Sequence, residues 1–143
     1  MLITTRTRYA VMSLVYMTTS GGDRPISLKE IAAEVHLDLS YLEQIFNVLR
    51  KSEIVSSVKG PGGGYKFCKA PQDINIYDLA NLFQDNLKLT TCKNPQASAC
   101  KVEGLRCNSH GLWAYMGGEL RSMLSNISIE DIKEGRYGYD KAS

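Results

Sequence analysis

The sequence has no long hydrophobic run. No segment approaches the ~20 consecutive apolar residues that a membrane-spanning helix requires. The best candidate, residues 10–17, is interrupted by Ser13 and followed by a polar, glycine-rich stretch at residues 18–23. Arg6 and Arg8 imitate the start of a secretory signal, but no small-residue cleavage pattern follows them. We therefore expect a cytoplasmic protein that does not associate with a membrane.

Strong net charge, internal repeats and low-complexity tracts are also missing. The 143 residues include 17 basic and 15 acidic side chains, a net charge of +2, with 43% hydrophobic and 22% charged residues. This composition and length are typical of one folded domain, or of one domain with an added helix. Residues 1–70 carry nine Lys/Arg and six Asp/Glu, a net of +3, whereas residues 71–143 carry eight and nine, a net of −1. A surface that contacts nucleic acid phosphates is therefore expected in the N-terminal half.

Cysteine is scarce, and its distribution is uneven. The four cysteines are at positions 68, 92, 100 and 107, so three of them fall within sixteen residues. Because no secretory signal is expected, metal binding or a redox response explains such a cluster better than structural disulfides do. Cys68 is remote from the other three, and we expect it to be a structural thiol.

The N-terminal half contains helix-forming patterns. A helix is expected over residues 5–17, and the pattern from Ser27 to Glu30 predicts a capping box at the start of a second, short helix. Residues 36–39 form the expected turn, with His36 as a solvated or capping residue. The apolar stripe of the second helix is Leu28, Ile31, Ala32 and Val35.

A third helix is expected directly after this turn. A second capping box, from Ser40 to Glu43, is predicted to open it. Its apolar stripe is Leu42, Ile45, Phe46 and Leu49. Its other side carries Ser40, Glu43, Gln44, Asn47, Arg50 and Lys51. Two short helices with a tight turn between them, the second with a polar face and a basic end, are typical of a helix-turn-helix. An ordinary helical hairpin explains these residues equally well.

A β-hairpin is predicted after these helices. Residues 54–58 are rich in strand-forming side chains, and residues 64–68 alternate ring-bearing and other side chains. The stretch from Lys59 to Gly64 between them lacks the Gly-Lys-Ser/Thr ending of a nucleotide-binding loop and leads into a strand rather than a helix. A hairpin that follows a helix-turn-helix is a wing. Its glycine-rich tip can approach the DNA backbone or minor groove, with Lys59 as the cation.

The C-terminal half predicts helices on both sides of a loop. Asn75 is expected to cap a helix over residues 76–83, and residues 86–107 are polar and aperiodic, which predicts a loop. A long helix is expected from Asn108 to residue 124, and a short one after Ser128.

The long helix carries more apolar surface than a single small domain needs to cover, so residues 108–127 are expected to form a dimer interface. Its apolar stripe includes Trp113, Met116, Leu120 and Leu124. Gly117 and Gly118 each cost the helix about 1 kcal/mol against alanine, unless they allow a second helix to pack closely.

The most specific chemical pattern is Cys92-x7-Cys100-x6-Cys107-x2-His110. Thiolates and a neutral imidazole are ligands of soft or borderline metals. Cys107 and His110 stand three residues apart where the long helix begins, so both can point to one side of its first turn, where partial positive charge favours a thiolate. Three interpretations remain open at this point. The long spacers suit an iron–sulfur cluster, the ligand types also suit structural zinc, and the thiols can be unliganded with His110 as a helix cap.

Three segments together resemble a known family. Residues 40–44 (Ser-Tyr-Leu-Glu-Gln), residues 55–65 (Val-Ser-Ser-Val-Lys-Gly-Pro-Gly-Gly-Gly-Tyr) and the Cys/Cys/Cys-x2-His pattern are similar to the IscR family of bacterial iron–sulfur cluster regulators. The similarity extends from Thr4 to about Ile132. It implies a mainly α fold with a small β wing, namely a winged helix-turn-helix homodimer with a long C-terminal dimerisation helix that crosses its partner.

The resemblance also implies the function and its residues. It implies a repressor that controls iron–sulfur assembly genes according to cluster supply, with the assembly machinery as cluster donor. One 2Fe–2S cluster per chain is implied on Cys92, Cys100, Cys107 and His110. The contacts to double-stranded DNA, including the basic end of the recognition helix, are expected from Ser40, Tyr41, Glu43, Gln44, Arg50, Lys51, Lys59 and Gly60.

Three features depart from the family pattern. Lys59 stands where relatives usually have arginine, so the planar guanidinium favoured in narrow minor grooves is missing. Glu53 replaces a glycine expected just after the recognition helix, which weakens a left-handed helix cap. The spacers between the cysteines are longer than in the best-known members.

These inferences divide the chain into four parts. Residues 1–85 form the winged helix-turn-helix domain, 86–107 the cluster-binding loop, 108–132 the dimerisation helix with a short terminal helix, and 133–143 a polar tail. The main alternative function is a nitric oxide- or iron-responsive repressor resembling NsrR or RirA, which are built around three cysteines without the Cys-x2-His ending. We do not expect an enzyme, because no substrate-binding motif is present and His110 lacks an evident orienting acid.

Overall fold

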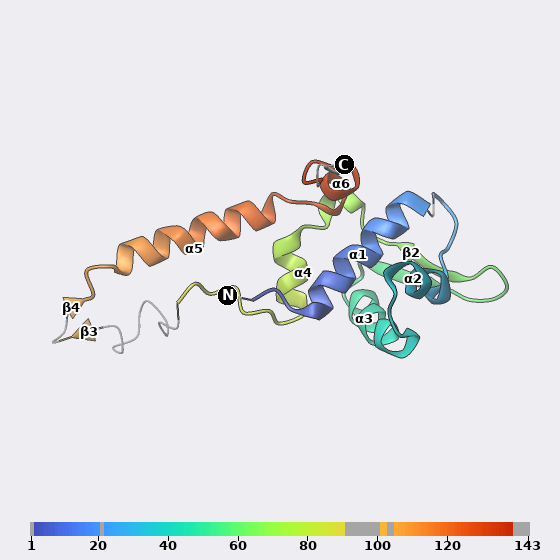
Figure 1. Ribbon diagram of the computed structural model, residues 1–143, viewed down its shortest axis with the longest axis horizontal. Coiled ribbons are helices and arrows are strands. Elements are labelled where there is room, and N and C mark those ends of the chain that lie inside the picture. The colour runs from blue at the N-terminus through green and yellow to red at the C-terminus, as the bar shows by residue number, and fades with distance from the viewer. Residues whose placement is uncertain (1, 21, 91–100, 103–104, 139–143) are drawn as a thin grey trace, which may run out of the picture.

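The computed structural model describes residues 2–20, 22–90, 101–102 and 105–138. It contains six α-helices, one short 3-10 helix and two small antiparallel hairpins within these ranges (Figure 1). In chain order the elements are α1 (Thr5–Ser20), α2 (Leu28–Val35), α3 (Leu39–Lys51), β1 (Val55–Val58), β2 (Gly64–Phe67), η1 (Pro71–Asp73), α4 (Ile76–Leu82), β3 (Lys101–Val102), β4 (Leu105–Arg106), α5 (His110–Ser125) and α6 (Ile129–Lys133). The predicted fold class, mainly α with a small β wing, is confirmed.

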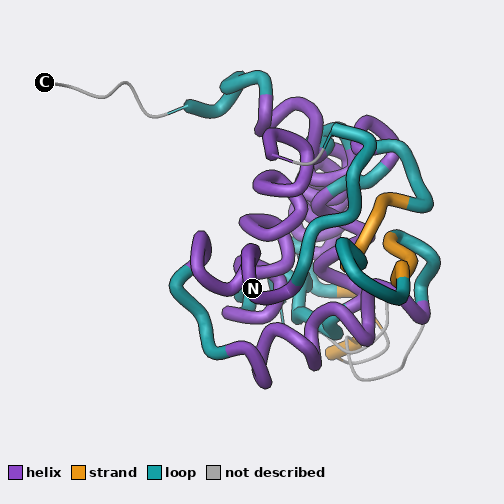
Figure 2. The backbone as a smooth tube through the Cα atoms, turned by 90° about the vertical axis from the view of Figure 1, so that its right-hand side faces the viewer, coloured by secondary structure: helices purple, strands orange, loops and turns teal. Residues whose placement is uncertain are grey.

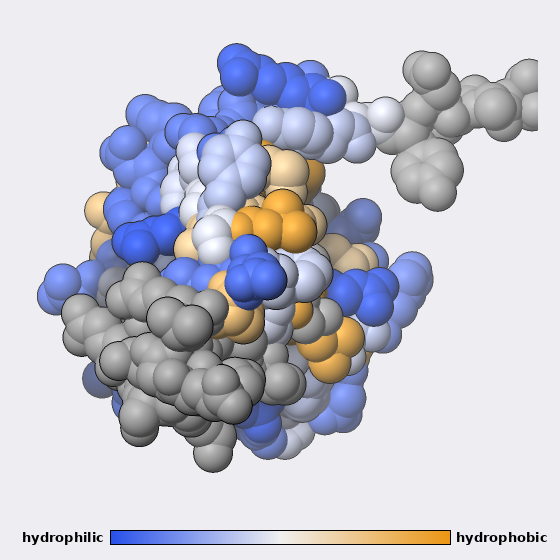
Figure 3. All heavy atoms as spheres, turned by 90° about the vertical axis from the view of Figure 1, so that its left-hand side faces the viewer, coloured by the Kyte–Doolittle hydropathy of each residue, from blue (hydrophilic) through white to orange (hydrophobic). Residues whose placement is uncertain are grey.

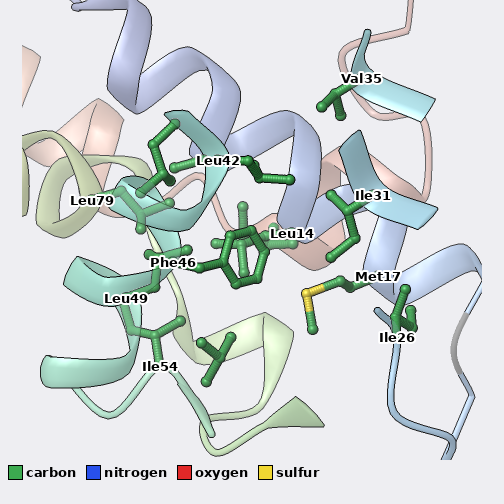
Figure 4. Close-up of a cluster of buried hydrophobic side chains, with 14 of the residues drawn as sticks. Leu14, Met17, Ile26, Ile31, Val35, Leu42, Phe46, Leu49, Ile54 and Leu79 are labelled. Carbon is green, nitrogen blue, oxygen red and sulfur yellow. The ribbon is translucent and has the colours of Figure 1, made fainter. Parts of the chain in front are cut away.

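The hydrophobic core forms around α1. This helix contacts α2, α3, α4 and α6, and its Leu14 and Met17 side chains lie among buried residues of the neighbouring elements (Figure 4). The predicted apolar stripe of α3 is at most 1% exposed and consists of Leu42, Ile45, Phe46 and Leu49. Full burial of such a side chain contributes about 1.5–3 kcal/mol. The core therefore fixes the orientation of α3 and leaves its polar side outward.

The start of α2 confirms half of the predicted capping box. The Ser27 hydroxyl accepts a hydrogen bond from the Glu30 N–H at 3.2 Å. The Glu30 carboxylate does not return this bond, because it binds the Arg24 guanidinium at 2.7 Å and accepts a hydrogen bond from the Tyr16 hydroxyl at 3.2 Å. The hydrogen bond from Arg24 lowers the pKa of the Glu30 carboxyl. This carboxylate thus ties α2 to the preceding loop and to α1.

The predicted capping box at the start of α3 is wrong. The helix begins at Leu39, and Asp38 is its N-cap, with a carboxylate that accepts a hydrogen bond from the Tyr41 N–H at 3.2 Å. The earlier start buries part of Leu39 against the core. The side chains of Ser40 and Glu43 are therefore not used for capping, and both are exposed.

Two helices end in the same hydrogen-bonded turn without a glycine. After α3, Glu53 has a left-handed φ of 57°, its N–H donates to the Arg50 carbonyl oxygen at 3.1 Å, and the Ile54 N–H donates to the Leu49 carbonyl oxygen at 3.0 Å. After α4, Gln84 has a φ of 60° and takes the equivalent position. This arrangement is the Schellman motif, in which glycine is the favoured left-handed residue.

The helices at the C-terminal end have different surroundings. In α5 the described residues are all exposed or half-buried, and this helix extends from the winged-helix domain as an arm that contacts α4 (Figure 1). By contrast, α6 returns to the domain and packs on α1 and η1, with Ile129 fully buried. The capping box between Ser128 and Asp131 opens α6. Hydrogen bonds from Ser128 lower the pKa of the Asp131 carboxyl.

Within the predicted loop over residues 86–107, the residues that the structure describes include a small pair of antiparallel strands. β3 pairs with β4, with Lys101 opposite Arg106 and Val102 opposite Leu105. In the part of the chain that the structure describes, no helix is long and apolar enough to cross a membrane.

Candidate DNA-binding surface and cysteine site

The predicted recognition helix, α3, presents a continuous polar side to solvent. The turn between α2 and α3 is tight, because His36 has a left-handed φ of 52° and the Leu37 N–H donates to the Ala32 carbonyl oxygen at 3.0 Å. His36 is thus a capping residue, as predicted, and the two helices have the arrangement of a helix-turn-helix. The exposed side chains of α3 include Ser40, Glu43, Gln44, Asn47, Arg50 and Lys51.

Tyr41 differs from these neighbours because it is half-buried. Its ring packs edge-on against the ring of Tyr9 in α1, with the centroids 6.3 Å apart and the planes at 88°. Edge-to-face pairs of this kind contribute about 0.5–1.5 kcal/mol beyond the area they bury. The N-terminal halves of α1 and α3 are therefore in direct contact beside the predicted DNA-contacting residues.

The wing is attached to the recognition helix at its base. β1 and β2 pair in antiparallel register, with Val58 opposite Gly64. Tyr65 exchanges two backbone hydrogen bonds with Ile26, at 2.8 and 3.0 Å. Its ring also contacts the Phe46 ring of α3, with 4.9 Å between the centroids. Viewed from the wing side, the two strands lie against the helices (Figure 2). The position of the wing relative to α3 is therefore fixed.

Glycine is required in the wing for two separate reasons. Gly60 and Gly62 have left-handed φ angles of 97° and 73°, which other residues adopt only at a cost. At Gly64 a Cβ atom would lie 2.3 Å from the carbonyl oxygen of Ile26, so no side chain fits there. The tip thus forms a narrow turn with Lys59 exposed at its edge, where an ammonium group can reach a phosphate.

The positive charge of α3 is concentrated at its C-terminal end. Arg50 and Lys51 lie in the last turn, where the helix dipole favours cations. Arg50 also donates a hydrogen bond to the Asn47 side-chain oxygen at 3.5 Å. Together with Lys59, these side chains provide exposed cations on α3 and on the wing that follows it.

Two of the four predicted cluster ligands lie at the start of α5. His110 is the first residue of the helix, and its N–H donates to the Cys107 carbonyl oxygen at 3.0 Å. Cys107 lies in the turn that leads into the helix, and its Sγ forms a 3.6 Å hydrogen bond with the Ser109 hydroxyl. Both Cys107 and His110 are half-buried and thus partly accessible.

The other two predicted ligands, Cys92 and Cys100, lie outside the described residues. Among the residues that are described, no group of three or more His, Cys, Asp or Glu is placed to hold a metal ion. Cys68 is exposed just after β2, so it contributes nothing to the hydrophobic core.

Three residues that position this surface were not found from the sequence. Asp38 caps α3, Tyr9 packs on Tyr41, and Asp85 accepts two hydrogen bonds from Thr4. Asp38 had a usable signal, because aspartate is among the favoured N-cap residues. The other two contacts join residues that are distant in sequence, and neither residue has a local pattern that indicates its partner.

A family profile described as an iron-dependent transcriptional regulator, Rrf2, matches residues 3–135. The chain belongs to the Rrf2 family. The matched range includes both the winged-helix domain and the segment that contains the three clustered cysteines.

Individual relatives agree with this family assignment. The HTH-type transcriptional regulator IscR of Photorhabdus laumondii is 33% identical over 142 residues, which cover 99% of this chain and 85% of that protein. This similarity confirms the predicted resemblance to IscR regulators.

Solved structures of Rrf2-like regulators have the same fold. CymR, described as the global cysteine regulator of B. subtilis, superposes with a TM-score of 0.76 and 25% identity, covering 94% of this chain and 97% of CymR. IscR of T. potens superposes with a TM-score of 0.72 and 25% identity, covering 100% of this chain and 93% of that one. The chain is therefore a DNA-binding transcriptional regulator of the winged-helix type, and not an enzyme.

Proposed function

We propose that this Rrf2 regulator senses iron–sulfur cluster supply in the bacterial cytoplasm and controls the genes of iron–sulfur assembly. The observation that carries the proposal is the ligand set Cys92, Cys100, Cys107 and His110 in a chain whose relatives include IscR. One 2Fe–2S cluster per chain, delivered by the assembly machinery, is the proposed cofactor.

Two residues of this ligand set, Cys107 and His110, are described, and their donor types support the proposal. Thiolates and imidazole are the donors that iron–sulfur centres use. Cys107 and His110 are both partly accessible, and they stand together at the positive end of the α5 dipole, which favours a thiolate over a thiol. A bound cluster would supply a redox- and iron-sensitive group. The chain itself supplies the thiolates and the imidazole that hold it.

The proposed DNA contacts divide between two elements. In a helix-turn-helix, the second helix enters the major groove with its N-terminal residues at the base edges. Ser40, Tyr41, Glu43 and Gln44 are in this position on α3, whereas Arg50 and Lys51 are at its far end. We assign base contacts to the first group and phosphate contacts to the second. Lys59 and Gly60 add a backbone or minor-groove contact from the wing.

A homodimer through α5 completes the proposal. Large hydrophobic side chains are exposed on this helix, namely Leu112, Trp113, Tyr115, Met116 and Met123. Seen from the end of the molecule where α5 lies, hydrophobic side chains are exposed among hydrophilic ones (Figure 3). A second α5 packed against this helix would remove that apolar surface from water. It would also place two recognition helices on one DNA site, as paired half-sites require.

The alternative is a nitric oxide- or iron-responsive repressor that holds its cluster on three cysteines alone. The two functions make different use of His110. In the proposed function the imidazole is a ligand, so its loss changes the cluster. In the alternative His110 only begins α5, and its loss leaves the cluster unchanged.

The deciding experiment measures the absorption spectrum of the anaerobically purified protein and counts iron and sulfide per chain. Two irons and two sulfides per chain are expected. Cys107→Ser is expected to lose the cluster, and His110→Ala is expected to change its spectrum. Cys68→Ser is the matched control, because Cys68 is an exposed cysteine just after β2 and lies outside the proposed ligand set. A wild-type protein without iron, or a Cys107→Ser variant with the full complement, would contradict the proposal.

A further inference from the structure

The N-terminus of the chain is tied to the two residues that follow the turn after α4. The Leu2 N–H donates to the Asn86 carbonyl oxygen at 3.1 Å. Thr4 donates twice to the Asp85 carboxylate, from its N–H to Oδ2 at 3.1 Å and from its hydroxyl to Oδ1 at 2.6 Å. The two segments lie side by side near the end of α4 (Figure 1). We call Leu2, Thr4, Asp85 and Asn86 the N-terminal clamp.

The Asp85 carboxylate accepts hydrogen bonds at the start of α1. In a capping box, the equivalent acceptor is a side chain of the helix itself. The Thr4 carbonyl oxygen accepts the first helical hydrogen bond, from the Arg8 N–H at 3.1 Å, so Thr4 occupies the N-cap position. In a capping box, the N–H of this residue bonds to a side chain three residues later. That position is Thr7 here, and the distant Asp85 carboxylate replaces it. Because Asp85 is only 8% exposed, water competes poorly for these bonds.

Asp85 is held firmly on its own side of the clamp. Its N–H donates to the Ala80 carbonyl oxygen at 2.9 Å, and Gln84 before it has the left-handed φ that closes the end of α4. The carboxylate therefore moves with this turn and with Asn86. Through its carboxylate, Asp85 thus connects this turn to Thr4 and to the first turn of α1.

The clamp joins the start of α1 to the segment that leads to Cys92. Towards the DNA surface, α1 continues to Tyr9, whose ring packs on Tyr41 of the recognition helix. In the other direction, Asn86 stands six residues before Cys92 in the sequence (92 − 86). Residues 85–90 line a groove of about 700 Å³ whose far wall belongs to α5.

We propose that Asp85 is a positioning residue that couples the cysteine segment to the DNA-binding surface. The inference rests on the proposed function. When the cysteine segment holds its cluster, residues 86–90 take a different position, which the Asp85–Thr4 hydrogen bonds transmit to α1 and the Tyr9–Tyr41 contact transmits to α3. DNA affinity then depends on the cluster through this clamp, because the two states of the segment favour different positions of Tyr41.

The test compares, for each variant, the ratio of DNA affinities of the cluster-loaded and cluster-free forms. Asp85→Ala removes both acceptors, and Thr4→Val removes the hydroxyl while it keeps the N–H and the side-chain volume. Thr4→Ser keeps the hydroxyl and is the conservative control. Ile74→Val removes a buried methyl group beside α6, which controls for a general loss of stability.

The affinity ratio is expected to fall towards one in Asp85→Ala and Thr4→Val, by at least about threefold, as is typical of residues that couple two sites. Thr4→Ser and Ile74→Val are expected to keep the wild-type ratio. A wild-type ratio of one would overturn the proposed function and the coupling with it. A wild-type ratio that differs from one and survives in both clamp variants would overturn the role of Asp85 alone.

Amide hydrogen exchange provides a readout that does not involve DNA. The Leu2 N–H is protected by its bond to Asn86, so its exchange rate reports the state of the clamp. In the wild-type protein this rate is expected to differ between the cluster-loaded and cluster-free forms, and in Thr4→Val it is expected to rise. If the Leu2 amide exchanges equally in both wild-type forms, the clamp does not respond to the cluster and the inference is wrong.

Discussion

Replacing Glu53 by glycine is expected to stabilise the protein at the end of its recognition helix. Glu53 has a φ of 57°, and two hydrogen bonds close α3 at this turn, one donated by the Glu53 N–H and one by the Ile54 N–H. Ile54 and Leu49 are buried on either side of the turn. These bonds and the apolar pair are the parts of a Schellman motif. Only the residue at the left-handed position is unsuited to it.

The size of the effect follows from three contributions. The left-handed conformation costs a residue other than glycine about 1–2 kcal/mol. The greater freedom of glycine in the unfolded chain offsets about 0.5–1 kcal/mol of that gain. Removing a carboxylate from the negative end of the α3 dipole adds about 0.3 kcal/mol. The net gain is about 1 kcal/mol, which corresponds to a rise in Tm of roughly 2–4 °C for a chain of this size.

Thermal and urea unfolding of the cluster-free protein measure this gain. Glu53→Ala is the matched control, because it removes the charge and keeps the unfavourable φ, so only about 0.3 kcal/mol of stabilisation is expected from it. If Glu53→Gly is no more stable than Glu53→Ala, the left-handed residue carries no strain and the reasoning fails.

Three further changes test the DNA surface and the dimer. Lys59→Ala is expected to weaken binding to all DNA sequences about equally and to reduce the salt slope of log affinity by about one, because the Lys59 ammonium contacts phosphate. Lys133→Ala on α6 is the control and should leave both the affinity and the salt slope unchanged. A loss of affinity confined to one sequence class would contradict the phosphate role. Met116→Lys is expected to convert a dimer into a monomer in light scattering at micromolar concentration, because it places a charge in the proposed α5 interface; a wild-type monomer would refute the interface. Glu43→Ala is expected to let the cluster-free protein bind DNA sites that it normally rejects, because the carboxylate repels phosphates and accepts only from donors such as cytosine N4. Asp38 rather than Ser40 caps α3, so the Glu43 change should alter stability by less than about 0.5 kcal/mol; an unchanged preference of the two forms for their sites would remove this role from Glu43.

Local patterns predicted most of the elements in this structure. The apolar stripe of α3 and the glycine-rich wing depend on neighbours in sequence, and the structure confirms both. The predicted N-cap of α3 was wrong because Asp38 and Ser40 are both favoured N-cap residue types. The choice between them is made by the packing of Leu39 on the core, which no local pattern contains. Similarly, the Glu30 carboxylate binds Arg24 in the preceding loop instead of forming the predicted capping hydrogen bond.

Contacts between segments that are distant in sequence could not be predicted from local sequence patterns. The pairing of Ile26 with Tyr65 joins the wing to the segment before α2, and α6 packs back on α1. Neither leaves a periodic signal, because each depends on how complete elements pack. For the cysteine site, the sequence supplied the ligand types, and the structure adds that Cys107 and His110 stand together at the start of α5. The dimer, the domain boundaries and the complete ligand set remain predictions.

The most direct test of the account is the affinity of one promoter DNA for the cluster-loaded and the cluster-free protein, measured anaerobically at one salt concentration. A regulator that senses its cluster must bind DNA differently in the two forms, because a group that does not distinguish two states of a protein cannot shift their equilibrium. We expect the two affinities to differ by at least about fivefold, the lower end of typical coupling between two sites. Equal affinities of the two forms for this promoter DNA would contradict the account.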